Sequence, residues 1–203
     1  MNDTLAYLER RAGVALQRAV SPPEIATLHK YMNLLIKWQK SQRLVGSSAP
    51  TWIVDHVIVD SLLFARVIPL ECRTLCDVGS GSGIPGIPLA AVMPDVDVTL
   101  LEARQKRGSF LATVIRELAL TNCHLVNRRL EQAGPELLQR FDVAVMRCAG
   151  SPTALWPQVR RLVRADGVVI ASGPPERRDV EFGDWLEVEG PDGPRRFWVH
   201  RTT

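Results

Sequence analysis

The chain has 203 residues, of which 46% are hydrophobic, and its formal net charge is +3. This length suits one domain with a short appended element, and the hydrophobic content excludes a globally disordered chain. No apolar run approaches the roughly 18–20 residues that span a bilayer, and the N-terminus lacks an apolar signal core. We therefore expect a cytoplasmic, monomeric protein without membrane contact.

The cysteines argue against a metal site or a disulfide framework. Cys72, Cys76, Cys123 and Cys148 form no Cys-x-x-Cys pair, and no cluster of cysteine and histidine has zinc spacing. We expect free buried thiols in a reducing compartment, and we expect no bound metal.

The first 70 residues carry helical patterns and predict an N-terminal helical extension. A helix start is predicted at Ser21, because this residue can cap, Pro22 suits the first turn, and Glu24 completes a capping box. Residues 51–67 carry a further helical pattern. Trp38 and Trp52 are expected to pack this region against the rest of the chain, with base stacking as the alternative.

Beyond residue 70, short apolar runs alternate with helical patterns. Helices are predicted over 104–119 and 153–164, and strands at Thr74–Val78, Val96–Leu101, Cys123–Val126, Asp142–Met146 and Gly167–Ala171. This alternation predicts right-handed βαβ units and a mostly parallel sheet. The runs Trp185–Glu189 and Arg196–Arg201 flank a turn rich in glycine and proline, and predict a C-terminal antiparallel hairpin. Residues 71–203 therefore predict an α/β domain that forms one compact unit with residues 1–70.

A glycine-rich turn, Asp77-Val78-Gly79-Ser80-Gly81-Ser82-Gly83, follows the first predicted strand. Ligands bind at this edge of open parallel sheets, and glycine lets the backbone approach a ligand closely. Glu102 closes the next strand, where a carboxylate can accept both ribose hydroxyls of a nucleoside. The stretch from Gly81 to Gly86 also matches G-x-G-x-x-G, so a dinucleotide enzyme and a merely structural turn are the alternatives.

The position of Asp77 favours S-adenosylmethionine over a dinucleotide. An acid is poorly placed beside a pyrophosphate, but it can attract the amino or sulfonium end of S-adenosylmethionine, directly or through water. The chain also lacks an evident His/Tyr/Lys set for hydride transfer. The turn therefore predicts a methyltransferase whose cofactor is S-adenosylmethionine, with Asp77, Gly79, Gly81, Gly83 and Glu102 as cofactor-binding residues.

The longer segment Asp77–Ala90, which includes Gly-Ile-Pro-Gly-Ile-Pro-Leu, resembles one family closely. It is similar to the RsmG family, also called glucose-inhibited division protein B, and further matches lie in His56–Leu62, Thr99–Leu111, Arg129–Glu131 and Phe141–Arg147. Those proteins are S-adenosylmethionine-dependent methyltransferases that modify N7 of one guanine in small-subunit (16S) ribosomal RNA. The resemblance implies the Rossmann-like class I methyltransferase fold. It also implies ribosomal RNA, or the small ribosomal subunit particle, as the partner.

The resemblance also assigns roles to single residues. It implies cofactor contacts at Gly79, Ile84, Leu130, Glu131 and Arg147, with Glu102 as the ribose acid. Arg147 is a candidate catalytic residue, as a clamp on the cofactor carboxylate or on an RNA phosphate. His56 is the other candidate, and a packing role is its alternative. We assign no general base, because guanine N7 carries a free lone pair.

Three observations bear on the acceptor. The chain has Arg43-Leu44-Val45 where the family commonly has Asn-Leu-Thr, and Ser172 where lysine is common. Arginine clusters such as 104–107 and 128–129 favour RNA over a small acceptor, while Lys106 and Arg107 form either a phosphate contact or a solvated helix face. The alternatives are therefore a methyltransferase of the same fold with another acceptor, and a non-catalytic RNA-binding relic.

Overall fold

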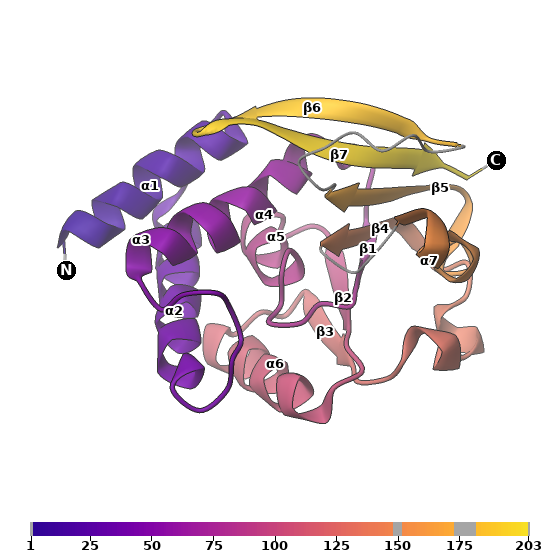
Figure 1. The fold of residues 1–203 in the computed structure, drawn as a ribbon, viewed down its shortest axis with the longest axis horizontal. Coiled ribbons are helices and arrows are strands. Elements are labelled where there is room, and N and C mark those ends of the chain that lie inside the picture. The colour runs from indigo at the N-terminus through magenta and orange to yellow at the C-terminus, as the bar shows by residue number, and fades with distance from the viewer. Residues whose placement is uncertain (1, 148–151, 173–181, 203) are drawn as a thin grey trace.

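The chain folds around a seven-stranded sheet with the strand order β3-β2-β1-β4-β5-β7-β6 (Figure 1). The computed structural model describes residues 2–147, 152–172 and 182–202. Most of the sheet is parallel and consists of β1 (Thr74–Val78), β2 (Asp97–Leu101), β3 (Cys123–Val126), β4 (Phe141–Arg147) and β5 (Val163–Ser172). The strand order reverses between β1 and β4, so the carboxyl end of β1 lies where such sheets bind ligands.

Helices cover both faces of the parallel strands. Two hydrophobic clusters result, one with α5 (Gly86–Val92) and α6 (Gln105–Leu118) and one with α7 (Pro152–Val159). Within β1, Leu75 belongs to the first cluster and Cys76 to the second. Burial on both faces explains why the sequence of these strands is almost continuously apolar.

Two long helices form the N-terminal region, α1 (Asn2–Leu16) and α2 (Pro22–Gln39). The predicted capping box is confirmed, because Glu24 accepts from the backbone N–H of Ser21 at 2.7 Å. Trp38 of α2 packs edge-on against Phe110 of α6, with ring centroids 5.5 Å apart. The N-terminal helices therefore share their hydrophobic core with the sheet.

A third helical segment, residues 50–66, changes its hydrogen-bonding pattern along its length. It runs through α3 (Pro50–Ile53), the π-helical turn η1 (Val54–Val59), α4 (Asp60–Leu62) and the 3-10 turn η2 (Leu63–Arg66). The predicted helix over 51–67 is therefore present, but a π-helical turn interrupts it. Such turns occur frequently at functional sites.

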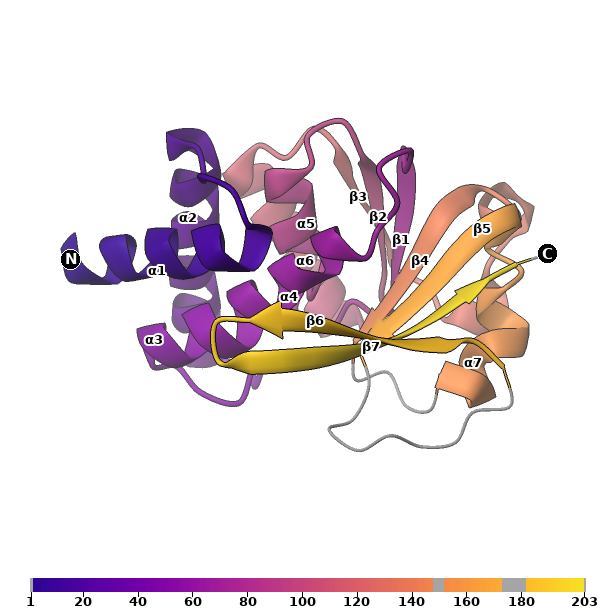
Figure 2. The same ribbon diagram turned by 90° about the horizontal axis from the view of Figure 1, so that it is seen from above.

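The predicted C-terminal hairpin is confirmed, as β6 (Asp184–Gly190) and β7 (Gly193–Arg201). β7 pairs antiparallel with β5 and closes that edge of the parallel sheet. Seen from above, the hairpin extends from the sheet to the N-terminal helices (Figure 2). At its tip Asp192 pairs with Arg11 of α1, which also binds Asp55 at 2.8 Å. The hairpin thus ties the two ends of the chain together.

One element is shorter than predicted and its neighbour is longer. Helix α7 ends at Val159 rather than near residue 164, and β5 begins at Val163 rather than at Gly167. The early start has a tertiary cause, since Val163 pairs with Phe141 ahead of an irregularity in β4. Cys72, Cys76 and Cys123 are free and buried as expected, and Cys148 lies outside the described residues.

The described residues contain no helix long and apolar enough to cross a membrane. In the same part of the chain, no group of His, Cys, Asp and Glu is arranged to hold a metal ion.

Candidate active site

The glycine turn adopts a backbone conformation that side chains disfavour. Gly79, Gly81 and Gly83 have φ values of +73°, +58° and +89°. A Cβ added at Gly83 would lie 2.5 Å from Cγ1 of Ile87, so this position requires glycine for space as well as for φ. The sequence thus produces a tight turn whose backbone is open to a ligand at the end of β1.

Glu102, at the end of β2, fixes the turn from one side. Its Oε2 accepts from the backbone N–H of Gly81 at 2.8 Å, and its Oε1 accepts from that of Arg104 at 2.7 Å. The residue is only 5% exposed. Each carboxylate oxygen has a further lone pair, so the side chain can hold the turn and still accept from a ligand hydroxyl.

Asp77 is buried beneath the turn. It is 0% exposed, and its Oδ2 accepts from the backbone N–H of Gly86 at the start of α5, at 2.9 Å. Its Oδ1 has no hydrogen-bond partner among the described residues. Burial raises the pKa of this carboxyl to about 7. The attraction of a cationic ligand by Asp77 stays a prediction. Because the carboxylate is buried, this electrostatic attraction would have to act across the backbone of the turn.

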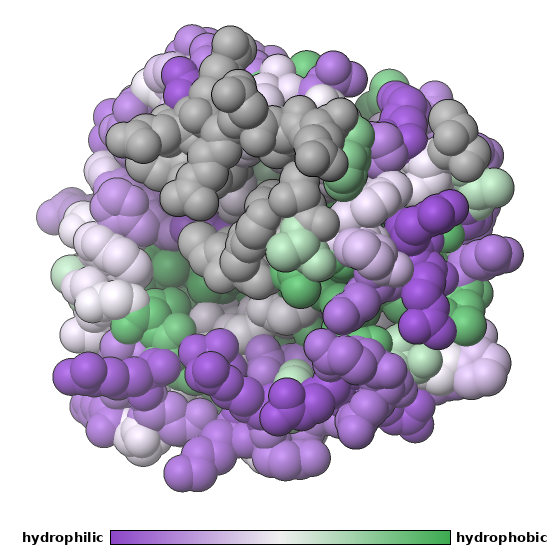
Figure 3. Space-filling view, turned by 45° about the vertical axis from the view of Figure 1, so that its right-hand side comes forward, coloured by the Kyte–Doolittle hydropathy of each residue, from purple (hydrophilic) through white to green (hydrophobic). Residues whose placement is uncertain are grey.

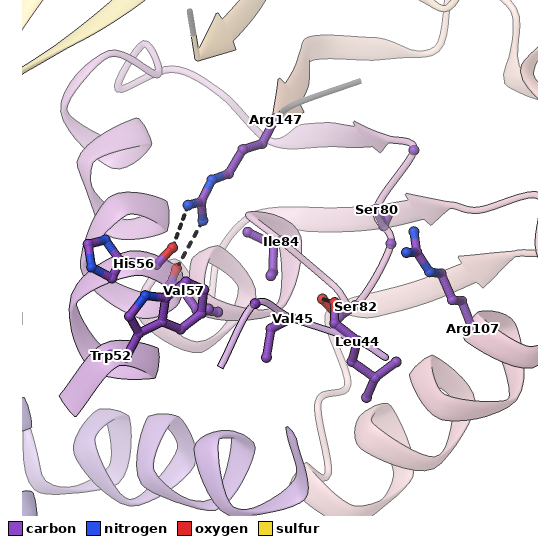
Figure 4. A pocket seen from close by; sticks show the side chains of 13 residues that line it. Leu44, Val45, Trp52, His56, Val57, Ser80, Ser82, Ile84, Arg107 and Arg147 are labelled. Carbon is purple, nitrogen blue, oxygen red and sulfur yellow. Dashed lines mark hydrogen bonds between the residues drawn. The ribbon is translucent and has the colours of Figure 1, made fainter. Parts of the chain in front are cut away.

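A central pocket of about 400 Å³ opens in front of the turn, between the sheet and the N-terminal region (Figure 4). The turn and the chain after it contribute Gly79, Ser80, Gly81, Ser82 and Ile84. The remaining lining comes from the helical segment, the loop before it, α6 and β4: Leu44, Val45, Gly46, Trp52, His56, Val57, Arg107 and Arg147. We call this the central pocket.

Arg147, at the end of β4, contacts the helical wall of the central pocket (Figure 4). Its guanidinium donates to the backbone carbonyls of His56 and Val57 in the π-helical turn, and to Oδ2 of Asp60 at 3.1 Å. Asp60 also accepts from Nε of Arg195 in β7, at 3.0 Å. A ligand anion would therefore share the Arg147 guanidinium with these acceptors or displace them.

His56 and Trp52 form an aromatic pair at the same wall. Their ring centroids are 4.9 Å apart, and both side chains line the central pocket. Trp52 packs against the same hydrophobic cluster as Trp38, and base stacking by Trp52 stays the alternative. The His56 ring packs against Trp52, as its packing alternative expects, and its role toward a substrate stays a prediction.

Leu130 and Glu131 border a second hollow of about 220 Å³ beside β1 and β2, which we call the strand-edge pocket. It is lined by Val78, Gly79, Leu101, Ala103, Arg128, Arg129, Leu130, Glu131 and Leu155. Gly79 lines both this pocket and the central one. The predicted cofactor residues are therefore divided between two hollows that meet at Gly79, while Asp77, Gly83 and Glu102 support the turn from behind.

Sequence reasoning missed several residues of the central pocket. Leu44 and Val45 were singled out only as a departure from the family pattern, and Gly46 was not singled out. All three come from a loop without a periodic pattern, so only the fold places them in the pocket. Tyr31 of α2 was not singled out as a site residue either. Its buried hydroxyl donates to the carbonyl of Ser82 at 2.8 Å and supports the turn, and burial raises its pKa.

The charges of the central pocket limit its chemistry. Among its described lining residues, the ionisable side chains are those of His56, Arg107 and Arg147, and none is a carboxylate. The pocket therefore suits an anionic or electron-rich ligand. It offers no carboxylate base, so it fits a reaction in which the attacking atom already has a free lone pair.

Comparisons with known proteins agree with this geometry. The family model described as "GidB: rRNA small subunit methyltransferase G" matches residues 24–175. The ribosomal RNA small subunit methyltransferase G of Chromobacterium violaceum is 34% identical over 83% of this chain and 79% of its own. That of Laribacter hongkongensis is 37% identical over 90% of this chain and 79% of its own.

The fold also resembles solved structures. A putative S-adenosylmethionine-dependent methyltransferase from Methanococcus maripaludis superposes with a TM-score of 0.58 at 12% identity. The match covers 86% of this chain and 93% of that protein. At this identity the likeness concerns the fold alone, and it confirms the predicted Rossmann-like methyltransferase architecture.

Proposed function

The chain belongs to the rRNA small subunit methyltransferase G family, and we propose that it transfers a methyl group from S-adenosylmethionine to N7 of a guanine in small-subunit (16S) ribosomal RNA. One observation carries the proposal beyond family membership. Two hollows meet at Gly79. The strand-edge pocket is bordered by Leu130 and Glu131, for which the family resemblance implies cofactor contacts near the adenine. The described lining of the central pocket contains no carboxylate base. We infer a nucleoside in the strand-edge pocket and the methyl group at the central pocket.

The residues present fit such a cofactor. Leu130 offers an apolar contact and Glu131 a polar one beside the adenine, and Glu102 retains acceptor capacity for the ribose. The positive φ of Gly79 lets the backbone pass between the two pockets without a side chain in the way. Arg147 reaches the central pocket from β4, where it can bind the cofactor carboxylate. Gly81, Gly83 and Ile84 shape the turn along which the cofactor would lie.

Bound S-adenosylmethionine supplies an electrophilic methyl group. The protein's own contribution is then orientation, because positioning two reactants accelerates a displacement strongly. Ile84 and Val57 supply apolar surface that restricts water, and the Trp52–His56 pair bounds the space in front of the turn. Guanine N7 needs no deprotonation before attack, which agrees with a pocket that lacks a carboxylate.

We further propose that residues 1–70 and 71–203 work as one unit in a monomeric, cytoplasmic enzyme. Two features support the first part, since the central pocket takes residues from both segments and the segments share one hydrophobic cluster. A sedimentation experiment in which only a dimer retained the methyltransferase activity would contradict the monomer.

Nucleoside analysis of 16S ribosomal RNA from a deletion strain tests the acceptor. We expect 7-methylguanosine to fall, and to recover with the wild-type gene but not with a Gly79→Val variant. Undiminished 7-methylguanosine would contradict the proposal. Calorimetry then separates the alternatives: heat with S-adenosylmethionine would indicate another acceptor, and its absence would indicate a non-catalytic relic.

A further inference from the structure

A third hollow adjoins the central pocket and is strongly basic. It measures about 440 Å³ and contains four cations, Arg43, Arg104, Lys106 and Arg107. Ser41, Gln42, Leu44 and Gln105 complete its lining. We call it the basic pocket. The loop after α2 forms one side of it, and the start of α6 forms the other.

The four cations have no acidic side-chain partner among residues 2–147, 152–172 and 182–202. Within the part of the chain that the structure describes, none of them forms an ion pair, whereas Arg11, Arg18, Arg128 and Arg147 each do. Like charges that gather around one hollow repel one another unless an anion enters. The first turn of α6 contains no acid, and cations there oppose the helix dipole. An anion in the pocket would therefore reduce the repulsion among these cations.

The basic pocket adjoins the central pocket. Leu44 and Arg107 line both of them. Figure 4 shows Arg107 extending from α6 toward the turn at Ser80, and a Cβ added at Gly81 would lie 3.2 Å from its Nη1. A ligand in the central pocket that continues past Arg107 would therefore enter the basic pocket.

The surroundings of the basic pocket are polar. In the space-filling view of Figure 3, hydrophilic residues form a band along the lower edge of the molecule, at the level of α6 in Figure 1. A hydrophilic surface suits a solvated ligand better than an apolar segment, and the four cations of the pocket favour an anionic one. Phosphate contacts of this kind position a nucleic acid without reading its sequence.

We propose that the basic pocket binds phosphate groups of the RNA strand whose guanine occupies the central pocket. The proposal rests on the proposed function, since it takes RNA as the acceptor. Arg43 and Arg104 can each bind a phosphate through two parallel hydrogen bonds, and Lys106 adds a point charge. Ser41 and Gln42 can donate further hydrogen bonds. Lys106 and Arg107 thus form a phosphate contact and not merely a solvated helix face.

A double variant, Arg43→Gln with Lys106→Gln, tests the proposal. Arg107 is left unchanged, because it also lines the central pocket. The matched control is Arg161→Gln with Arg201→Gln, which removes the same charge near the amino end of β5, whereas the glycine turn follows the carboxyl end of β1. The probe is a fluorescein-labelled fragment of small-subunit ribosomal RNA, and its affinity is measured by anisotropy between low and physiological salt.

We expect the basic-pocket variant to bind the RNA about tenfold more weakly at physiological salt, with a salt slope lower by about 0.7 for each phosphate that the protein no longer neutralises. Its KM for ribosomal RNA should rise while kcat and the affinity for S-adenosylmethionine stay unchanged. The control variant should stay within about twofold of the wild type in every measurement. Thermal unfolding of both variants checks that the fold is intact.

Each other outcome overturns the proposal in a distinct way. Unchanged RNA affinity and salt slope would make the cluster a solvated face. Weakened binding of S-adenosylmethionine would assign the pocket to the cofactor. If calorimetry showed inorganic phosphate binding that the variant abolished while RNA binding persisted, the site would take free phosphate. A wild-type protein that neither binds nor methylates ribosomal RNA would instead contradict the proposed function itself.

Discussion

The two walls of the central pocket are held in different ways. The glycine turn is fixed by buried carboxylates that accept backbone N–H groups, Glu102 from Gly81 and Asp77 from Gly86. The helical wall, formed by residues 50–66, is fixed by ion pairs. Asp60 pairs with both Arg147 and Arg195, and the side chain of Arg195 is 36% exposed. Buried hydrogen bonds to charge are strong and insensitive to salt, whereas partly exposed ion pairs are weaker and screened. The turn should therefore behave as rigid, and the helical wall as adjustable.

The strongest test of a rigid turn is Gly79→Val. A β-branched residue at φ +73° is a steric outlier, and its side chain would project where the two pockets meet. We expect calorimetry to detect no binding of S-adenosylmethionine. Arg196→Ala, at the hairpin, should leave binding unchanged, because Arg196 contacts Glu187 far from the turn. Equal losses in both variants would mean that stability, not the site, had been probed.

The buried carboxyl group of Asp77 should make the stability of the fold depend on pH. Burial raises the pKa of this carboxyl from 3.8 to about 7, so the unfolded chain ionises first as pH rises. Ionisation then favours the unfolded state until the folded carboxyl also ionises near pH 7. The wild type should therefore lose stability relative to Asp77→Asn between about pH 4 and 7, on the order of 4 kcal/mol. Chemical denaturation across this range measures the unfolding free energy of both proteins. If the difference between them did not change with pH, the burial of the Asp77 carboxylate would be contradicted.

Glu102→Ala should also disturb the glycine turn, but with a smaller effect on cofactor binding than Gly79→Val. The substitution leaves the backbone N–H groups of Gly81 and Arg104 without their acceptor, which costs about 1–3 kcal/mol for each buried group. We expect the affinity for S-adenosylmethionine to fall at least about tenfold. Glu102→Gln keeps one acceptor oxygen and should lose less. If Glu102→Gln bound as weakly as the alanine variant, the negative charge and not the hydrogen bonds would be what matters.

Arg147→Ala tests the adjustable wall and should have the smallest effect of the set. A charged hydrogen bond to the cofactor carboxylate contributes about 1.5–3 kcal/mol, and the existing pairing of Arg147 with Asp60 offsets part of that gain. We expect a loss of about tenfold in affinity for S-adenosylmethionine that shrinks as salt is raised.

Arg195→Ala is the control for Arg147→Ala, because it removes the other partner of Asp60 while leaving Arg147 in place. Its cofactor affinity should stay close to that of the wild type. An equal loss in both variants would show that Arg147 acts by holding the hairpin and not by binding a ligand.

The two walls also differ in how far the sequence predicts them. The glycine turn, its acid Glu102 and the helix start at Ser21 depend on residues close together in the chain, so spacing alone identified them. The orientation of Asp77 depends on where α5 begins relative to β1, and sequence patterns do not contain that distance. The sequence therefore could not show that its Oδ2 accepts from the backbone N–H of Gly86, and its attraction of a cationic ligand, directly or through water, stays a prediction.

The helical wall combines residues far apart in the sequence, and its key contacts could not be predicted. Arg147 was expected to bind a ligand anion, but its partners Asp60 and the carbonyl of His56 come from a distant helical segment. The π-helical turn that presents those carbonyls has the same apolar pattern as an ordinary helix. Likewise, β5 begins early because Val163 pairs with Phe141, a contact that no local pattern contains.

The most direct test of the account is methyl transfer by the purified protein. Small-subunit ribosomal RNA and small subunits from a deletion strain would each be incubated with S-adenosylmethionine carrying a labelled methyl group, and the digested nucleosides analysed by mass spectrometry. We predict label in 7-methylguanosine with at least one of the two substrates, and none with the Gly79→Val variant. Label in a different nucleoside, or no label from a protein that binds S-adenosylmethionine, would contradict the assignment of the central pocket to a guanine N7 acceptor.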